Sequence, residues 1–165
     1  MTTPIVEKDL DNATLTVTTE FDAPLEHVWQ LFADPRKLEK WWGPPTYPAT
    51  VHQHELRPGG KVVYSMTGPE GDTHYGLWNV IAVDEPGSFE VEDLFADENG
   101  NPNPELPATV MRYEFAETGG RTQMRCVARY ASPEALQQVL EMGMEEGLVA
   151  AMSQIDGVLA EIAAA

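Results

Sequence analysis

Cysteine, basic residues and long apolar runs are scarce in this chain, and each shortage excludes a class of protein. Cys126 is the only cysteine among 165 residues, so neither an internal disulfide nor a cysteine-rich zinc site can form. No segment approaches the roughly 20 consecutive apolar residues of a membrane-spanning helix. The first residues lack the basic start and apolar run of a signal peptide. We therefore expect a cytoplasmic protein.

The shortage of basic residues makes the chain strongly acidic. Ten Lys and Arg stand against 27 Asp and Glu, which gives a formal net charge of −17. No Lys or Arg lies between Lys61 and Arg112, where ten acidic residues occur, and none follows Arg129. Such a surface repels phosphate backbones and anionic lipids, so we expect no binding to nucleic acid or membrane. Acidity of this degree also keeps a protein soluble.

Length and composition indicate one globular domain. With 42% hydrophobic and 22% charged residues, a chain of this size can bury its own core. We expect the domain to cover residues 1–165, with residues 1–12 as a loose lead-in. Residues 14–21 alternate β-branched and other side chains, which predicts the first strand.

One short helix and six further strands are predicted after that strand. The helix is expected to begin near Pro24 and to end at Asp34-Pro35, because a residue before proline avoids helical geometry. Residues 35–48 are expected to form a loop. Turns rich in Gly and Pro then separate strand-like runs at 49–57, 61–68, 73–83, 88–95, 109–117 and 121–130.

The chain ends in a predicted amphipathic helix. Ser132 is a typical N-cap residue, and apolar residues recur at helical spacing from Leu136 to Ile162. A break is expected near Gly143. Since an antiparallel sheet must cover one face, these elements predict an α+β fold in which a curved seven-stranded antiparallel sheet wraps around the long C-terminal helix.

A series of short motifs along the chain is similar, in order and spacing, to that of a known superfamily. They are Phe21-Asp22-Ala23-Pro24, Val28-Trp29, Trp41-Trp42-Gly43-Pro44, Glu55-Leu56-Arg57-Pro58-Gly59-Gly60, Gly76, Thr122 and Glu146-Gly147-Leu148. Their order resembles the START-like (SRPBCC) superfamily with its helix-grip fold, and within it the AHSA-type domains, homologues of an activator of heat-shock protein ATPase. The resemblance implies a cavity between sheet and helix that takes small apolar or amphipathic molecules. Some members are polyketide cyclases.

The inward faces of the predicted strands and helix would line such a cavity, because side chains alternate across a strand. These faces are rich in aromatic residues and in methionine, which adapts to varied partners. Core packing is the alternative explanation for any single methionine. The predicted ligand-binding residues are Trp42, His52, His54, Tyr64, Met66, His74, Trp78, Met111, Tyr113, Met124, Met144 and Leu148.

Two details of this set stay open. In the strand at 73–83, either His74 and Trp78 or Tyr75 and Leu77 face inward, and we favour the first pair. The adjacent Trp41 and Trp42 cannot both be buried in an extended loop, so we expect one to anchor the loop and Trp42 to flank the pocket.

The histidines raise two further alternatives. His52 and His54 lie two apart on one strand, with His74 nearby, and such a group can hold a metal ion or supply a general base. That spacing is common by chance, so we predict polar groups at the pocket and assign no metal, cofactor or catalytic residue. Cys126 has no expected cation beside it, which argues against a reactive thiolate.

Three functions are compatible with these observations. The first is binding of a small hydrophobic or amphipathic molecule between the sheet and the C-terminal helix. The second is an enzyme of the polyketide cyclase or dehydratase type that uses His54, His52 or Tyr64. The third is an interaction module like a chaperone cofactor, acting through the acidic surface. Formation of a homodimer is left open.

Overall fold

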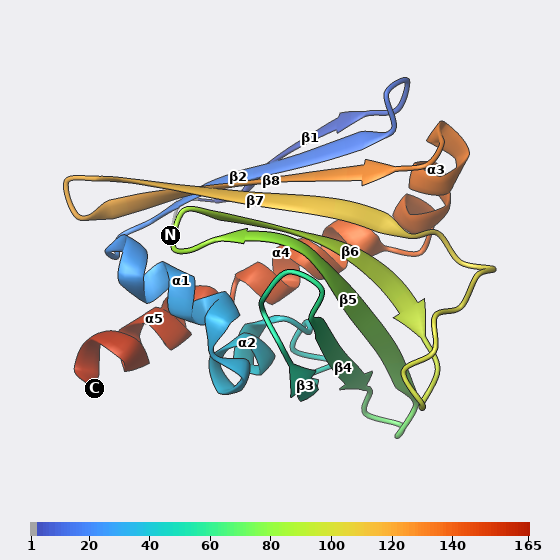
Figure 1. Ribbon diagram of the computed structural model, residues 1–165, viewed down its shortest axis with the longest axis horizontal. Helices are drawn as coiled ribbons and strands as arrows, with labels where there is room; N and C mark the ends of the chain where they lie inside the picture. The colour runs from blue at the N-terminus through green and yellow to red at the C-terminus, as the bar shows by residue number, and fades with distance from the viewer. Residues whose placement is uncertain (1–2) are drawn as a thin grey trace.

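A computed structural model describes residues 3–165 as an α+β protein, with one curved antiparallel sheet and helices on its concave face (Figure 1). The sheet has eight strands in the order β1-β2-β8-β7-β6-β5-β4-β3. The elements are β1 (Ile5–Asp9), β2 (Thr14–Phe21), α1 (Leu25–Ala33), α2 (Pro35–Trp41), β3 (Ala49–His54), β4 (Lys61–Thr67), β5 (Thr73–Asp84), β6 (Ser88–Ala96), β7 (Thr109–Thr118), β8 (Arg121–Tyr130), α3 (Pro133–Glu141), α4 (Met144–Met152) and α5 (Ile155–Ala164).

Most strands pair with their neighbours in sequence. From β3 to β8 each strand pairs antiparallel with the next, and β1 pairs with β2. The pairing of β2 with β8 joins the β1–β2 pair to the other six strands in one sheet. The helices α4 and α5 cross the concave side, where α5 contacts α1 and α2. This architecture confirms the predicted helix-grip fold.

The expected loose lead-in contains an eighth strand, so the prediction of seven strands was wrong. Strand β1 pairs with β2 from Ile5 opposite Thr18 to Asp9 opposite Thr14. It lies at the sheet edge, and four of its five residues are exposed. Because backbone hydrogen bonds rather than buried side chains hold this strand, its sequence carries little hydrophobic alternation.

The predicted loop after the first helix begins with a second helix. Asp34-Pro35 does end α1, but the Asp34 side chain then accepts a hydrogen bond from the backbone N–H of Arg36 and caps α2. Pro35 occupies the first turn, where its missing N–H is not needed. Leu38 and Trp41, three apart, are buried. The same dipeptide that stops one helix therefore starts the next.

The C-terminal helix is divided into three segments. Gly143 breaks it between α3 and α4 with a φ of 86°, as predicted, and a second break at Ser153 and Gln154 separates α4 from α5. The segment Met144–Ala164 has 21 residues and a mean hydropathy of 1.3, enough to span a membrane by length and composition alone. Met152 and Ile155 within it are buried in the core, so the helix packs on the sheet of a soluble-type fold.

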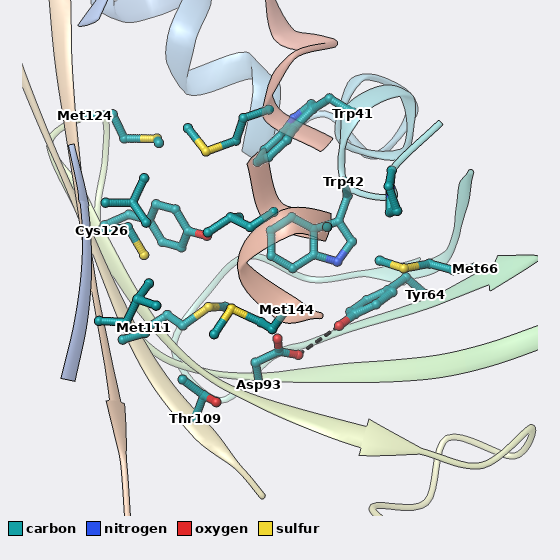
Figure 2. A pocket seen from close by; sticks show the side chains of 18 of the residues that line it. Trp41, Trp42, Tyr64, Met66, Asp93, Thr109, Met111, Met124, Cys126 and Met144 are labelled. Carbon is teal, nitrogen blue, oxygen red and sulfur yellow. Dashed lines mark hydrogen bonds between the residues drawn. The ribbon is translucent and has the colours of Figure 1, made fainter. Parts of the chain in front are cut away.

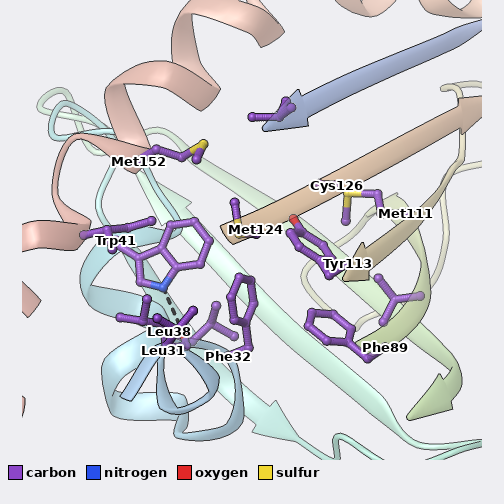
Figure 3. Close-up of a cluster of buried hydrophobic side chains, with 14 of the residues drawn as sticks. Leu31, Phe32, Leu38, Trp41, Phe89, Met111, Tyr113, Met124, Cys126 and Met152 are labelled. Atoms are coloured by element: carbon purple, nitrogen blue, oxygen red, sulfur yellow. Dashed lines mark hydrogen bonds between the residues drawn. The ribbon is translucent and has the colours of Figure 1, made fainter. Parts of the chain in front are cut away.

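Aromatic rings fill the concave face at the end where α1 and α2 lie (Figure 3). Phe32 of α1 is fully buried, and its ring centroid lies 5.2 Å from that of Trp41. It lies 5.2 Å from the ring of Phe89, 4.9 Å from that of Tyr113 and 5.4 Å from that of Phe115. These contacts fix both short helices on strands β6 and β7.

Two glycines of the C-terminal segments should respond in opposite directions to alanine. Gly143→Ala places a side chain at a φ of 86° and should lower the free energy of unfolding by about 1 kcal/mol. Gly157→Ala lies within α5, where an added Cβ meets nothing within 4 Å, and should raise it by about 0.5–1 kcal/mol. Urea unfolding of both variants measures this, and equal effects would contradict the break at Gly143.

Candidate functional site

A pocket of about 270 Å³ lies between the sheet and α4, beside the aromatic cluster around Phe32 (Figure 2). Most of its wall is apolar. Strands β2, β4, β6, β7 and β8, the loop after α2 and helix α4 all contribute residues. Five of the chain's methionines line it, namely Met66, Met111, Met124, Met144 and Met152.

Strand alternation explains why β7 and β8 supply so much of this wall. Met111, Tyr113, Met124 and Cys126 are buried on the concave face. Their exposed neighbours on β8 are charged or polar, including Arg125. Since both strands follow the simple period of two, the inward residues are the ones that the sequence pattern predicts.

One carboxyl group lies within this apolar wall. Asp93 of β6 accepts a hydrogen bond at Oδ1 from the Tyr64 hydroxyl, with 2.9 Å between the oxygens. Burial disfavours the carboxylate and raises the pKa of Asp93 to about 7, and the bond from Tyr64 opposes this rise only in part. Asp93 is half-buried because the pocket leaves part of its surface accessible.

This carboxyl group lacks a compensating cation in the pocket wall that the structure describes. Among the described residues, no Lys, Arg or His lines the pocket. Burial raises the pKa of Tyr64 and Tyr113 well above its ordinary value and raises that of Tyr130 as well. It raises the pKa of Cys126 to about 12. All four groups are therefore neutral near pH 7, and the Cys126 thiol is not an activated nucleophile.

Gly76 allows Tyr64 to reach Asp93. Tyr64 on β4 lies directly opposite Gly76 on β5, and Trp78 on β5 lies opposite Asp93 on β6. A Cβ atom added at Gly76 would overlap the ring and hydroxyl of Tyr64. The Tyr64 ring therefore crosses over β5 where that strand has no side chain, and its hydroxyl meets the carboxyl on the next strand.

The two adjacent tryptophans have different roles, as expected. Trp41 is buried and donates from Nε1 to the Leu31 carbonyl oxygen at 3.0 Å. Trp42 is half-buried, and its ring contacts those of Trp78 and Tyr64 edge-to-face at centroid distances of 4.9 and 5.8 Å. Its buried indole N–H has no partner in hydrogen-bond geometry among the described residues. Trp42 thus forms a wall of the pocket beside the Tyr64–Asp93 pair.

A second pocket, of about 280 Å³, adjoins the first. Six residues line both, among them Tyr64, Asp93 and Met144. His74 and Pro107 line the second pocket and not the first. Because Asp93 stands between the two spaces, a molecule in either pocket can reach it.

The structure brings eight of the twelve predicted ligand-binding residues to the first pocket. They are Trp42, Tyr64, Met66, Met111, Tyr113, Met124, Met144 and Leu148. His74 lines the second pocket, where its exposed side chain lies 3.4 Å from Asp72. Trp78 does face inward, as favoured, but it is fully buried behind Trp42 and lines neither pocket.

His52 and His54 do not reach either pocket, which corrects the prediction for both. A β-bulge between Val51 and Gln53 disrupts the alternation of β3. It leaves His52 exposed, with Nε2 at 2.7 Å from Ser65 Oγ. His54 Nε2 donates to the Phe32 carbonyl oxygen at 2.8 Å, at the end of α1. Both imidazoles are therefore engaged away from the pocket and could not serve the proposed enzyme there.

Asp93 is one of the lining residues that the predicted set lacks, and it is the only acid among the described residues of the first pocket. Phe89, Val91 and Asp93 alternate along β6 on one face, and the first two are fully buried. The same alternation that we applied to neighbouring strands therefore places Asp93 inward. An acidic residue in an inward register was the available signal. In the described part of the chain, no group of three or more metal-ligating side chains could hold an ion.

The fold and its pocket define a helix-grip domain of the START-like class. Residues 22–160 match the family model described as activator of Hsp90 ATPase homolog 1-like protein. The chain therefore belongs to that family. The comparison with curated proteins found no match.

Solved structures of similar proteins cover nearly the whole chain. It is 55% identical to protein Ms6760 of Mycobacterium smegmatis, with a TM-score of 0.86 over 94% of this chain and 95% of that one. It is 43% identical to a protein from Arthrobacter aurescens, with a TM-score of 0.92 over 97% and 93%. A Staphylococcus epidermidis protein is 25% identical, with a TM-score of 0.82 over 98% and 94%.

The Asp93 carboxyl should make stability depend on pH. Its pKa of about 7 lies above its ordinary value of 3.8, so its stabilising contribution is complete below pH 3.8 and is lost as pH rises through 7. Asp93→Asn keeps an acceptor for Tyr64 and removes the charge. Between about pH 4 and pH 8, the free energy of unfolding of wild type should fall by roughly 2–4 kcal/mol relative to that of this variant.

Urea unfolding at both pH values measures the effect, and Glu92→Gln is the matched control. Glu92 is the neighbouring acid on the opposite face of β6, where Asn79 Nδ2 lies 3.4 Å from its Oε1. That variant should follow the wild-type pH dependence. If the free energy of unfolding changed equally between the two pH values in wild type and in Asp93→Asn, the Asp93 carboxyl would not be desolvated.

Proposed function

We propose that this protein binds a small apolar or amphipathic molecule in the pocket between its sheet and α4. The observation that carries the proposal is an apolar pocket with one hydrogen-bonded acid–phenol pair, Asp93 and Tyr64, in its wall. Ligand sites typically combine a largely apolar surface with a few placed polar groups that orient the ligand. The apolar part of the molecule would fill the methionine-lined space, and its polar group would face Asp93.

The size of the pocket supports this proposal. The first pocket holds about 270 Å³, just below the range of typical small-molecule sites. The second, of about 280 Å³, shares six lining residues with it, so a longer molecule could extend past Asp93. Ligands from one ring to an extended chain are therefore compatible with the space.

The flexible side chains at the rim support an adaptable site. Met66, Met144 and Leu148 are only partly buried and border the first pocket from β4 and α4. Methionine fills irregular space and adjusts to different shapes. An added Cβ at Gly147 meets nothing within 4 Å, so α4 leaves room at this point. These features favour a site that binds several related molecules over a site that fits one molecule of fixed shape.

Filling the pocket should weaken binding. Ala128 is buried on β8 and lines the pocket, so Ala128→Phe should weaken binding of the neutral fluorescent probe N-phenylnaphthylamine by at least about tenfold. Ala116→Phe adds the same ring to the exposed face of β7 and should bind as wild type does. If Ala128→Phe does not fold, Gly147→Met is a second variant that fills the pocket. Unchanged affinity in folded filling variants would contradict the proposed function.

The acid–phenol pair favours a second candidate function, proton transfer to or from the bound molecule. A carboxyl group with a pKa of about 7 can act as acid or base near neutral pH, and Tyr64 holds it in place. This candidate replaces the histidine-based enzyme of the sequence analysis, because neither His52 nor His54 faces the pocket.

Hydrogen–deuterium exchange tests this candidate. Benzylacetone, an enolisable ketone that fits an apolar pocket, is incubated with the protein in deuterium oxide, and exchange beside its carbonyl is followed by NMR. Catalysed exchange should rise as pH rises through 7, where Asp93 becomes a base, and should vanish in Asp93→Asn. Equal exchange with both proteins would exclude Asp93 as the base for this ketone.

A further inference from the structure

We propose that the molecule this pocket takes carries a protonated amine, whose ammonium group pairs with Asp93 beside the rings of Trp42 and Tyr64. The proposal rests on the proposed function, since it names the class of ligand for the same pocket. Four features support it: the free oxygen of Asp93, the absence of a cation in the wall, the aromatic rings beside the carboxyl, and the charge of the whole protein.

Asp93 has one oxygen left for a ligand. The Tyr64 hydroxyl donates to Oδ1, and no described residue donates to Oδ2, which points into the pocket (Figure 2). No basic residue among those described lines this pocket. A carboxylate withdrawn from water without a cation is unfavourable, so a bound ammonium would supply both the missing charge and the missing hydrogen bond.

Aromatic rings next to the carboxyl suit a cation. Trp42 and Tyr64 meet edge-to-face with centroids 5.8 Å apart, and both line the pocket beside Asp93 (Figure 2). The face of an indole or phenol ring attracts a cation, most strongly where water is excluded. The thioether of Met144 lines the same space and adds a polarisable contact.

The charge of the protein disfavours anionic ligands such as fatty acids. The net charge is −17, and the only charged side chain in the pocket wall among the described residues is acidic. Glu146 on α4 lies beside Gly147, which borders the pocket, whereas the charge of Glu145 is paired with Lys8 at 2.7 Å. The resulting potential attracts cations and repels carboxylates.

Binding of an amine should also depend on pH. Burial raises the pKa of Asp93 to about 7, whereas Tyr64, Tyr113, Tyr130 and Cys126 have raised pKa values and stay neutral. His74 on β5 is a further titratable residue beside this carboxyl among those described, since it lines the second pocket with Asp93. Trp78 and Thr109 lie opposite Asp93 on the two adjacent strands and do not titrate. Affinity for an amine should therefore increase as pH rises through 7 and Asp93 ionises.

Three probes with one apolar part and different end groups test the proposal. Phenylbutylamine, phenylbutanol and phenylbutyrate are titrated by calorimetry into wild type, Asp93→Asn and the control Glu92→Gln at about pH 8. Wild type and Glu92→Gln should bind the amine at least about tenfold more tightly than the alcohol, as expected for a charged hydrogen bond. Asp93→Asn should lose that preference, and lowering the pH to about 6 should weaken amine binding to wild type and to Glu92→Gln but not to Asp93→Asn.

The outcomes separate this proposal from the proposed function. If the alcohol or the butyrate binds wild type as tightly as the amine, the pocket binds ligands but the amine proposal is overturned. If the preference for the amine, or its pH dependence, persists in Asp93→Asn, another group recognises the amine and the proposal is overturned. If none of the three probes binds, both the amine proposal and the proposed function fail.

Discussion

The packing of Phe32 against four other aromatic rings determines which part of the concave face is closely packed and which part is left as a pocket. Its ring contacts Trp41 of α2 and the rings of β6 and β7, and so fixes α1 and α2 on one end of the concave sheet. Tyr113 belongs to this cluster and also lines the pocket. Beyond Tyr113 the inward side chains include the flexible Met111 and Met124, and α4 covers them without filling the space. The aromatic cluster thus supplies a rigid floor for an adaptable pocket.

Asp93 gives this apolar space its chemical character. Three strands cooperate to place one acid there: β6 carries it, β4 supplies the Tyr64 hydroxyl, and Gly76 on β5 lets the phenol pass between them. Burial raises the pKa of this group to about 7, and no compensating cation lines the pocket among the described residues. A natural core rarely retains such a carboxyl for stability alone, because a hydrophobic residue of similar size would stabilise the fold more. Because a hydrophobic residue would stabilise the fold more, the presence of this carboxyl in the pocket wall indicates a role in binding a ligand.

Much of the fold and part of the site could be predicted from the sequence. On β7 and β8 the alternation is regular, so Met111, Tyr113 and Met124 were correctly placed inward. The histidines of β3 were misplaced because a bulge changes which face each residue meets, and a bulge leaves no mark in a hydrophobic pattern. Asp93 was missed for a different reason, since the lining was predicted from apolar, aromatic and histidine side chains, and an acid at an inward position does not stand out in that pattern. Strand β1 was missed because an exposed edge strand shows little alternation.

The central claim is that the Asp93 carboxyl stands desolvated in a pocket that a ligand fills. An NMR titration of the Asp93 side-chain carbonyl carbon tests this most directly, since it reports the protonation of that one group in the folded protein. The account predicts a midpoint near pH 7, which binding of an amine moves to lower pH because the ammonium favours the carboxylate. A midpoint near the ordinary value of 3.8 would place the carboxyl in bulk water and contradict the account.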